Sequence, residues 1–109
     1  MIYMENIQIP KNGFYVHYKH NLEDAERFNY VYEVVGIGRN TEDKTYTVLY
    51  RPMYKNDWMP PATLQSRPLE MFLENVTVDG KTMKRFTPID VNDEKLISDL
   101  EKRRKEMYE

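Results

Sequence analysis

The sequence predicts a mainly β protein, a small SH3-like barrel of about five antiparallel strands followed by a C-terminal α-helix. Short runs of β-branched and aromatic residues recur between turns that contain glycine and proline, which is typical of an all-β domain. Aromatic residues make up 13% of the 109-residue chain, and large rings supply the buried area that a small barrel needs. Helical periodicity is confined to the end of the chain.

We expect one domain, because a chain of this length has room for a single modest core. The expected organisation is an N-terminal arm at residues 1–12, a β-barrel domain at residues 13–90 and a C-terminal helix at residues 91–109. The arm leads into the turn Lys11-Asn12-Gly13, whose residue types favour chain reversal.

The first strand is predicted from Phe14 to Lys19. Alternate side chains of a strand point to opposite faces. We therefore expect one face of this strand to build a core and the other to touch a ligand. The core face would hold Phe14, Val16 and Tyr18, and the other face Tyr15, His17 and Lys19.

Two further strands are predicted at residues 30–39 and 45–51, where tyrosine, valine and isoleucine are concentrated. Gly36 and Gly38 suit a bulge or a sharp bend within the first of these strands. The segment 21–29 breaks the β pattern. It forms either a short helical turn capped by Asn21 or a solvated loop between two strands.

The segment Pro52–Pro68 is predicted to be an irregular loop, because its four prolines interrupt both strands and helices. Long loops in small domains are often functional, and this one carries the single tryptophan, Trp58. One helical turn is expected at 69–72. A hairpin follows at 76–87, with Asp79-Gly80 as its two-residue turn.

The tail is predicted to be a helix from Asp93 to Tyr108, with Asn92 as its cap. Its apolar residues fall on one stripe at helical spacing. That stripe must be buried, either on the barrel or on a second copy of the chain. The stripe contains Leu96, Ile97, Leu100, Arg104 and Met107.

Composition narrows the function class. The formal net charge of -2 argues against a protein that coats nucleic acid, which is usually strongly basic. The chain has no cysteine, no recognisable signal peptide and no apolar run of membrane-spanning length. We expect a small soluble cytoplasmic protein that has no cofactor and does not associate with a membrane.

Five short patterns occur in a distinctive order. Together they resemble the small bacterial family catalogued as domain of unknown function 1653, over about Gly13 to Pro88. The resemblance implies a compact β-rich domain and no established activity. The patterns are Gly-x-Tyr-x-His-Tyr-Lys from Gly13 to Lys19, Tyr-x-Val-x-Gly from Tyr32, Tyr-Arg-x-x-Tyr from Tyr50, Arg-Pro-x-x-Met-Phe from Arg67, and Arg85-Phe86.

Two features depart from the family pattern. Residues 21–29 look inserted between the first two strands. Family members tend to place a tryptophan just before the Arg-Pro pair, whereas here Trp58 is separated from Arg67 by residues 59–66.

His17 is the first candidate for chemistry, and three roles stay open for it. It is a structural strand residue, a ligand contact or a proton-transfer group. Catalysis would need an orienting partner, for which Glu33 is available, and a nucleophile, for which no residue stands out. No catalytic residue is therefore assigned. His17 and His20 lie three apart on a strand, which does not suit a metal site, so no metal is expected.

Arg51 and Arg67 each border a proline and lie near aromatic residues. Arginine stacks on rings and binds carboxylate or phosphate through two nitrogens. With Lys19 and Arg85 they would form a small cationic pocket. The alternative is that these arginines pair with Glu33, Glu70 or Glu74.

We predict a non-enzymatic binding module that recognises a small anionic or aromatic ligand, a nucleotide or nucleic acid in a polar-aromatic groove. The alternative is a protein-interaction or self-assembly domain that uses the C-terminal helix, for example in a homodimer, and the Pro52–Pro68 loop. A hydrolase that uses His17 has the least support. The predicted ligand-binding residues are Tyr15, His17, Lys19, Arg51, Tyr54, Trp58 and Arg67.

Overall fold

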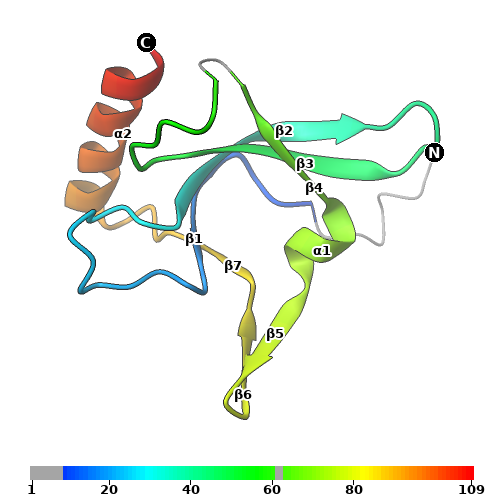
Figure 1. The fold of residues 1–109 in the computed structure, drawn as a ribbon, viewed down its shortest axis with the longest axis horizontal. Helices are drawn as coiled ribbons and strands as arrows, with labels where there is room; N and C mark the ends of the chain where they lie inside the picture. Colours follow the sequence, from blue (N-terminus) through cyan, green and yellow to red (C-terminus); the bar gives the residue numbers. More distant parts are fainter. Residues whose placement is uncertain (1–8, 61–62) are drawn as a thin grey trace.

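The computed structural model describes residues 9–60 and 63–109. Most of the predicted N-terminal arm lies outside these residues. A five-stranded antiparallel sheet has the strand order β4-β3-β2-β1-β7, and β5 and β6 form a separate hairpin that projects from the body (Figure 1). The elements are β1 (Gly13–His17), β2 (Val31–Arg39), β3 (Tyr46–Pro52), β4 (Gln65–Pro68), α1 (Leu69–Leu73), β5 (Asn75–Val78), β6 (Lys81–Lys84), β7 (Phe86–Pro88) and α2 (Glu94–Tyr108).

The predicted mainly β fold with a C-terminal helix is confirmed, but closure into an SH3-like barrel is not. In the strand pairing of the described residues, β4 and β7 are the two edges of the sheet and are not hydrogen-bonded to each other. Both edge strands end in proline, at Pro68 and Pro88, which has no N–H to donate and therefore protects an edge from further pairing.

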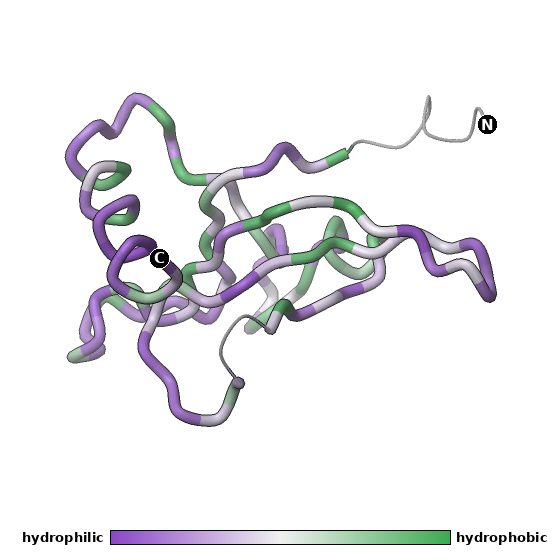
Figure 2. Tube along the Cα trace, turned by 90° about the horizontal axis from the view of Figure 1, so that it is seen from above, coloured by the Kyte–Doolittle hydropathy of each residue, from purple (hydrophilic) through white to green (hydrophobic). Residues whose placement is uncertain are grey.

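The sheet buries both of its faces, which explains why hydrophobic residues follow one another along its strands. On β1, Tyr15 belongs to one core cluster and Phe14 to the other. The first cluster is completed by Leu69 and Phe72 of α1, and the second by Leu100 of α2. Figure 2 shows the hydrophobic residues along the strands and the hydrophilic residues at the far tip of the β2–β3 hairpin.

A predicted bulge and a predicted turn are both confirmed. The pairing of β2 with β3 shifts register between Val34 and Gly36, which is the bulge expected near this glycine. Asp79 and Gly80 have φ angles of 50° and 78°. Positive φ at both positions defines the tight hairpin turn that Asp-Gly favours.

Two predicted segments differ in the structure. The stretch expected to be an irregular loop from Pro52 to Pro68 contains β4, whose strand character is hidden by its final proline. The return strand expected at 82–87 is divided between β6 and β7. Between them, the Arg85 N–H donates to Glu74 and the Arg85 carbonyl accepts from Tyr18, so the chain passes from the hairpin to the main sheet.

The segment 21–29 forms turns and no helix. The Asn21 side chain accepts a hydrogen bond from the Glu23 N–H at 2.9 Å, so Asn21 stabilises a turn instead of capping a helix. The cap of α2 is Asp93, one residue later than expected, and its side chain accepts from the Leu96 N–H at 3.2 Å.

Helix α2 packs on the sheet of its own chain. Leu100 is fully buried against the second core cluster. Arg103 donates to Glu26 and to the Met53 carbonyl, and Arg104 donates to Glu33. The apolar stripe is therefore used within the chain, which counts against the alternative that it joins two copies. Among the described residues, no helix has the length and apolarity to cross a membrane.

Replacing Leu100 with alanine should lower the free energy of unfolding by about 3 kcal/mol, because a fully buried leucine leaves a cavity when it is truncated. The matched control is Leu22→Ala, since Leu22 is 91% exposed and its truncation should change stability by less than about 0.5 kcal/mol. Urea denaturation of both variants measures the difference. Equal losses would show that α2 is not packed as described.

Candidate functional site

His17 is the last residue of β1 and lies at the open end of the aromatic core. Only 8% of its surface is exposed. Its ring stacks on Tyr30 with a centroid distance of 5.6 Å and lies 4.5 Å from Tyr18. The ring of Phe86 meets it edge-on at 5.0 Å. The imidazole is therefore fixed by rings on several sides.

The surroundings of His17 favour its neutral form. Burial is the main cause that lowers the pKa of His17, and the positive charges of Arg67, Lys19 and Arg85 lower it further, to about 4. All three charged groups are cations, and they come from three separate segments of the chain. His17 is thus an uncharged imidazole at neutral pH within a positive electrostatic environment.

Two of these cations have no carboxylate partner among residues 9–60 and 63–109. The Arg67 Nε donates to the Tyr50 hydroxyl at 3.3 Å, and its guanidinium lies 5.5 Å from the centroid of Phe86. The Lys19 ammonium lies 6.0 Å from the ring centroid of Tyr18. Arg85, in contrast, is paired with Glu74 at 2.8 Å. The positive charge of Arg67 and Lys19 is therefore available to an anion.

Tyr30 has a backbone conformation that is uncommon for a large residue. Its φ angle is 56°, in the left-handed region. The carbonyl of Tyr30 accepts a hydrogen bond from the His17 N–H at 2.8 Å, and the residue is 38% exposed. A strained aromatic residue costs about 1–3 kcal/mol and is found most often at binding and active sites.

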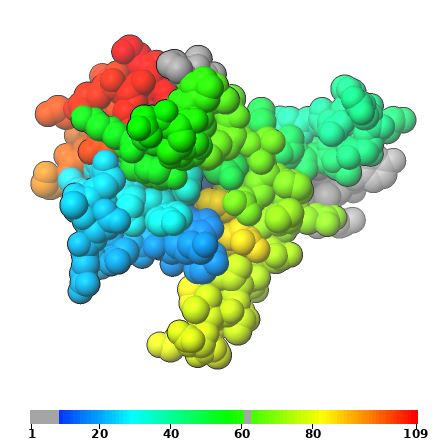
Figure 3. Space-filling view, viewed as in Figure 1, coloured from blue at the N-terminus to red at the C-terminus, as the bar shows by residue number. Residues whose placement is uncertain are grey.

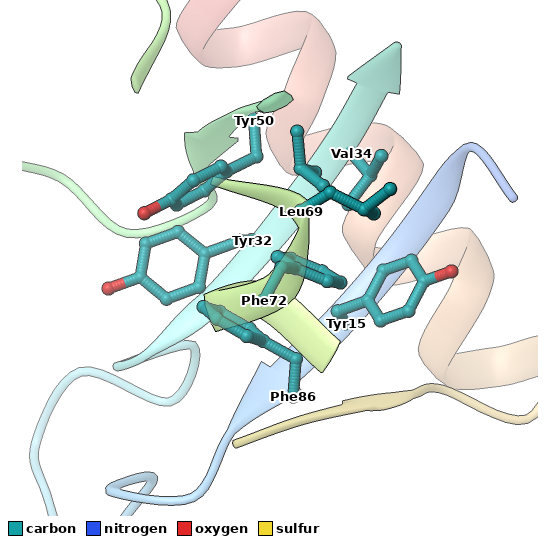
Figure 4. Close-up of a cluster of buried hydrophobic side chains, with 8 residues drawn as sticks. Tyr15, Tyr32, Val34, Tyr50, Leu69, Phe72 and Phe86 are labelled. Carbon is teal, nitrogen blue, oxygen red and sulfur yellow. The ribbon is translucent and has the colours of Figure 1, made fainter. Parts of the chain in front are cut away.

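Tyrosine hydroxyls border the same end of the core. The Tyr54 hydroxyl lies 3.0 Å from that of Tyr32, and the ring of Tyr54 lies 6.4 Å from that of Tyr30. Burial raises the pKa of Tyr54. Figure 4 shows the hydroxyls of Tyr32 and Tyr50 pointing to one side of the cluster. Opposite Tyr50 on β4, the side-chain oxygen of Gln65 is buried without a hydrogen-bond partner among the described residues.

We call His17, Lys19, Tyr30, Tyr54 and Arg67 the His17 surface. In Figure 3 the segments that carry these residues, coloured blue, cyan and two shades of green, meet around a shallow hollow next to the yellow segment before β7. Four of the seven predicted ligand-binding residues belong to this surface. Tyr30 was not predicted, because neither its backbone angle nor its stacking on His17 has a signature in the sequence.

Arg51 is not brought to the His17 surface. It pairs with Glu33 across the β2–β3 ladder, with both its Nε and its Nη2 at 2.9 Å from the carboxylate. Glu33 also binds Arg104 of α2 at 2.9 Å, and the Tyr108 ring covers the Arg51 guanidinium at 4.1 Å. Arg51 therefore lies on the α2 side of the sheet with its charge neutralised, as the ion-pair alternative described.

Tyr15 and Trp58 also lie apart from the His17 surface. Tyr15 is 7% exposed, and its hydroxyl donates to the Lys11 carbonyl at 2.8 Å. Figure 4 shows this hydroxyl pointing away from those of Tyr32 and Tyr50. Trp58 is 58% exposed in the segment between β3 and β4, and none of the ring contacts of the described residues joins it to His17.

A cavity of about 390 Å³ lies at the Tyr15 end of the aromatic core, lined mainly by apolar residues that include Phe72, Pro88 and Val91. His17 and Arg67 do not line it. Of the described residues that line it, only Lys11 and Lys84 are charged. Among the described residues, no three histidine, cysteine, aspartate or glutamate side chains are placed to hold a metal.

Comparison with known proteins agrees with the resemblance found in the sequence. The family model described as "Protein of unknown function (DUF1653)" matches residues 13–88, more than half of the chain. The crystal structure of a DUF1653 protein from Bordetella bronchiseptica is 23% identical, covers 79% of this chain and 91% of its own, and superposes with a TM-score of 0.58. No curated protein matches. The chain belongs to the DUF1653 family.

The burial of neutral His17 predicts a loss of stability in acid. Its pKa is lowered from 6.5 to about 4 by folding, so below pH 6.5 the unfolded chain takes up a proton that the folded chain does not. Stability should fall by about 2 kcal/mol between pH 7 and pH 4.5, relative to a His17→Gln variant. Urea denaturation at a series of pH values measures this. A difference between the two proteins that does not change with pH would contradict it.

Proposed function

We propose that this DUF1653 protein is a non-enzymatic binding module that holds a small ligand with an anionic group and a planar ring on the His17 surface. The observation that carries the proposal is that the charge around His17 has one sign: within residues 9–60 and 63–109, every charged group that shifts the pKa of His17 is a cation. Arg67 and Lys19 have no carboxylate partner among the residues of known placement. A surface of this kind attracts an anion.

The rings of the surface support a planar partner. Tyr30 is stacked on His17 but leaves 38% of its surface exposed, and Tyr54 lies beside it. Exposed rings held by neighbours bind planar groups at little cost in conformational entropy. The fixed rings would therefore hold a base or phenyl group, while the cations hold its charge.

The protonation of His17 argues for binding without bond making. A general base acts best when its pKa lies near the working pH. The pKa of His17 is about 4, so it accepts a proton poorly at neutral pH. A hydrolytic role for His17 therefore has no support from its environment.

We interpret the sheet as a half-open, SH3-like barrel that curls around the aromatic core. Arg67 on the edge strand β4 lies 5.5 Å from Phe86 on the opposite edge strand β7. Phe72 of α1 stacks on Phe86 at 4.2 Å. Side chains of β4 and β7 therefore contact each other although the two strands are not hydrogen-bonded. The His17 surface lies beside these side-chain contacts.

A ligand of the size of a mononucleotide is favoured over a polymer. The chain has a net charge of -2, and the cations that act on His17 number three. Single-stranded nucleic acid is usually held by a continuous basic groove. A local cluster of this extent is matched instead by one phosphate or carboxylate group.

The test is a titration of the protein with 5′-AMP, 5′-CMP and phenyl phosphate, with adenosine and inorganic phosphate as the two halves of the ligand. We expect the complete ligands to bind more tightly than either half. Arg67→Ala should weaken binding at least about tenfold, because a charge-assisted contact is lost. Lys19→Ala should weaken it about threefold, since Lys19 is exposed and contributes mainly charge.

The matched control is Arg39→Ala, an exposed arginine at the far end of β2, which should bind as the wild type does. Circular dichroism verifies that each variant is folded. The proposal fails if none of the ligands binds, or if Arg67→Ala and Lys19→Ala both bind as tightly as Arg39→Ala. An oligonucleotide that binds much more tightly than 5′-AMP would contradict the proposal that the ligand is a small molecule.

A further inference from the structure

We infer that His17 donates a hydrogen bond to the ligand through its Nε2–H, and that together with Arg67 and Lys19 it selects a phosphate monoester. This inference rests on the proposed function, because it concerns the ligand of the same surface. It goes further by assigning a donor role to a histidine that the sequence left open among three roles, and by naming the anionic group.

The position of the imidazole proton follows from one hydrogen bond. The backbone N–H of Lys19 donates to His17 Nδ1 at 3.2 Å. A backbone N–H only donates, so Nδ1 must present its lone pair. In a neutral imidazole the single ring proton is then on Nε2, which makes this atom a donor.

The Nε2 atom is free to bind a ligand. No hydrogen bond joins it to a residue in the described part of the chain. It is also not among the buried side-chain atoms that lack a partner, so it is not sealed from solvent. Rings pack against His17 at Tyr18, Tyr30 and Phe86 and fix the direction in which Nε2 points.

Arg67 is close enough to His17 for its positive charge to lower the pKa of the imidazole. His17 and Arg67 both contact the Phe86 ring, at 5.0 Å and 5.5 Å from its centroid. The Arg67 Nε is used by the Tyr50 hydroxyl, which leaves the two terminal nitrogens of the guanidinium for a ligand. Lys19 follows His17 by two residues and adds an ammonium group.

The three side chains suit a phosphate monoester better than a carboxylate. A phosphate monoester offers three terminal oxygens and a charge between about −1.5 and −2 at pH 7. A neutral donor beside two cations matches these oxygens without placing three positive charges together. A carboxylate carries a single charge on two coplanar oxygens, so it offsets only one of the two cations.

The pH dependence of binding separates a neutral His17 from a protonated one. The charged and titratable groups around His17 are Arg67, Lys19 and Arg85, the last paired with Glu74, together with Tyr18 and Tyr30. Side chains of these other types ordinarily titrate below pH 5 or above pH 9. The other histidine nearby is His20, whose backbone N–H donates to the His17 carbonyl at 2.9 Å. A change in affinity between pH 5.5 and pH 8 therefore reports His17, the ligand or His20, and a His20→Gln variant separates His20 from the other two.

The experiment compares phenyl phosphate with phenyl sulfate by titration calorimetry from pH 5.5 to pH 8. The sulfate keeps one charge throughout, whereas the phosphate gains its second charge near pH 6. We expect the affinity for phenyl sulfate to stay constant and that for phenyl phosphate to rise with pH by up to about fourfold, the increase in the doubly charged fraction over this range. Benzoate should bind at least about tenfold more weakly than phenyl phosphate at pH 8.

Two variants isolate the donor. His17→Phe retains an aromatic ring without an N–H and should lower the affinity for phenyl phosphate at least about tenfold, whereas His17→Gln, which retains an N–H, should recover part of it. Ring nitrogen shifts in an NMR spectrum of the wild-type protein should show the Nε2–H tautomer. This spectrum does not depend on any variant being folded.

The possible failures are distinguishable. If neither phenyl ester binds and 5′-AMP and 5′-CMP fail to bind as well, the proposed function fails and the inference with it. If both bind but their affinity falls as pH rises through 6.5, or if the spectrum shows the Nδ1–H tautomer, the donor role is wrong while the proposed function stands. If benzoate binds as tightly as phenyl phosphate, the assignment of a phosphate monoester is wrong.

Discussion

The Phe86 ring is the contact on which the rest of the structure depends. It stacks on Phe72 at 4.2 Å and meets the rings of His17, Tyr32 and Tyr50 within 6 Å. These rings come from α1 and from three different strands, so one side chain on the short edge strand β7 connects most of the sheet. Offset and edge-on ring pairs add about 0.5–1.5 kcal/mol each beyond their buried area. The position of His17 and Arg67 follows from this packing, because both lie against Phe86.

The two faces of the sheet differ in how their positive charges are compensated. On the α2 side, Glu33 pairs with Arg51 and Arg104, Arg104 also lies 3.7 Å from Glu101 and from Glu109, and Glu26 pairs with Arg103. Such partly buried networks fix the helix on the sheet, and removing one partner leaves a charge without compensation. On the aromatic side the cations near His17 lower its pKa, and no carboxylate of the described residues acts on it. We propose that a bound anion compensates the positive charge on this side, as Glu33 does on the α2 side.

Local patterns predicted much of the fold. The Asp79-Gly80 turn and the periodic tail each depend on neighbouring residues, and the structure confirms them. The expectation that the Tyr15 face of β1 is open to a ligand is wrong for Tyr15, because the sheet has a core on both faces and Tyr15 is 7% exposed. Strand β4 was missed because four residues ending in proline resemble a loop. The sequence did not decide whether Arg51 pairs with a carboxylate or contacts a ligand. The decision depends on Arg104, which shares Glu33 with Arg51, and on Tyr108, which covers Arg51, and both come from the far end of the chain. Of the candidate site, His17, Lys19, Tyr54 and Arg67 were predicted, whereas the role of Tyr30 depends on a backbone angle that only the folded chain has.

The most direct test of where this protein binds is a map of amide and side-chain NMR shifts as phenyl phosphate is added to the wild-type protein. If the packing around Phe86 creates the binding surface, the shifts that change most will belong to His17, Lys19, Tyr30 and Arg67, and those of Arg51 will stay constant. Changes centred instead on Lys84 and Val91, at the cavity beside Tyr15, would contradict the account. They would place the ligand at the opposite end of the aromatic core.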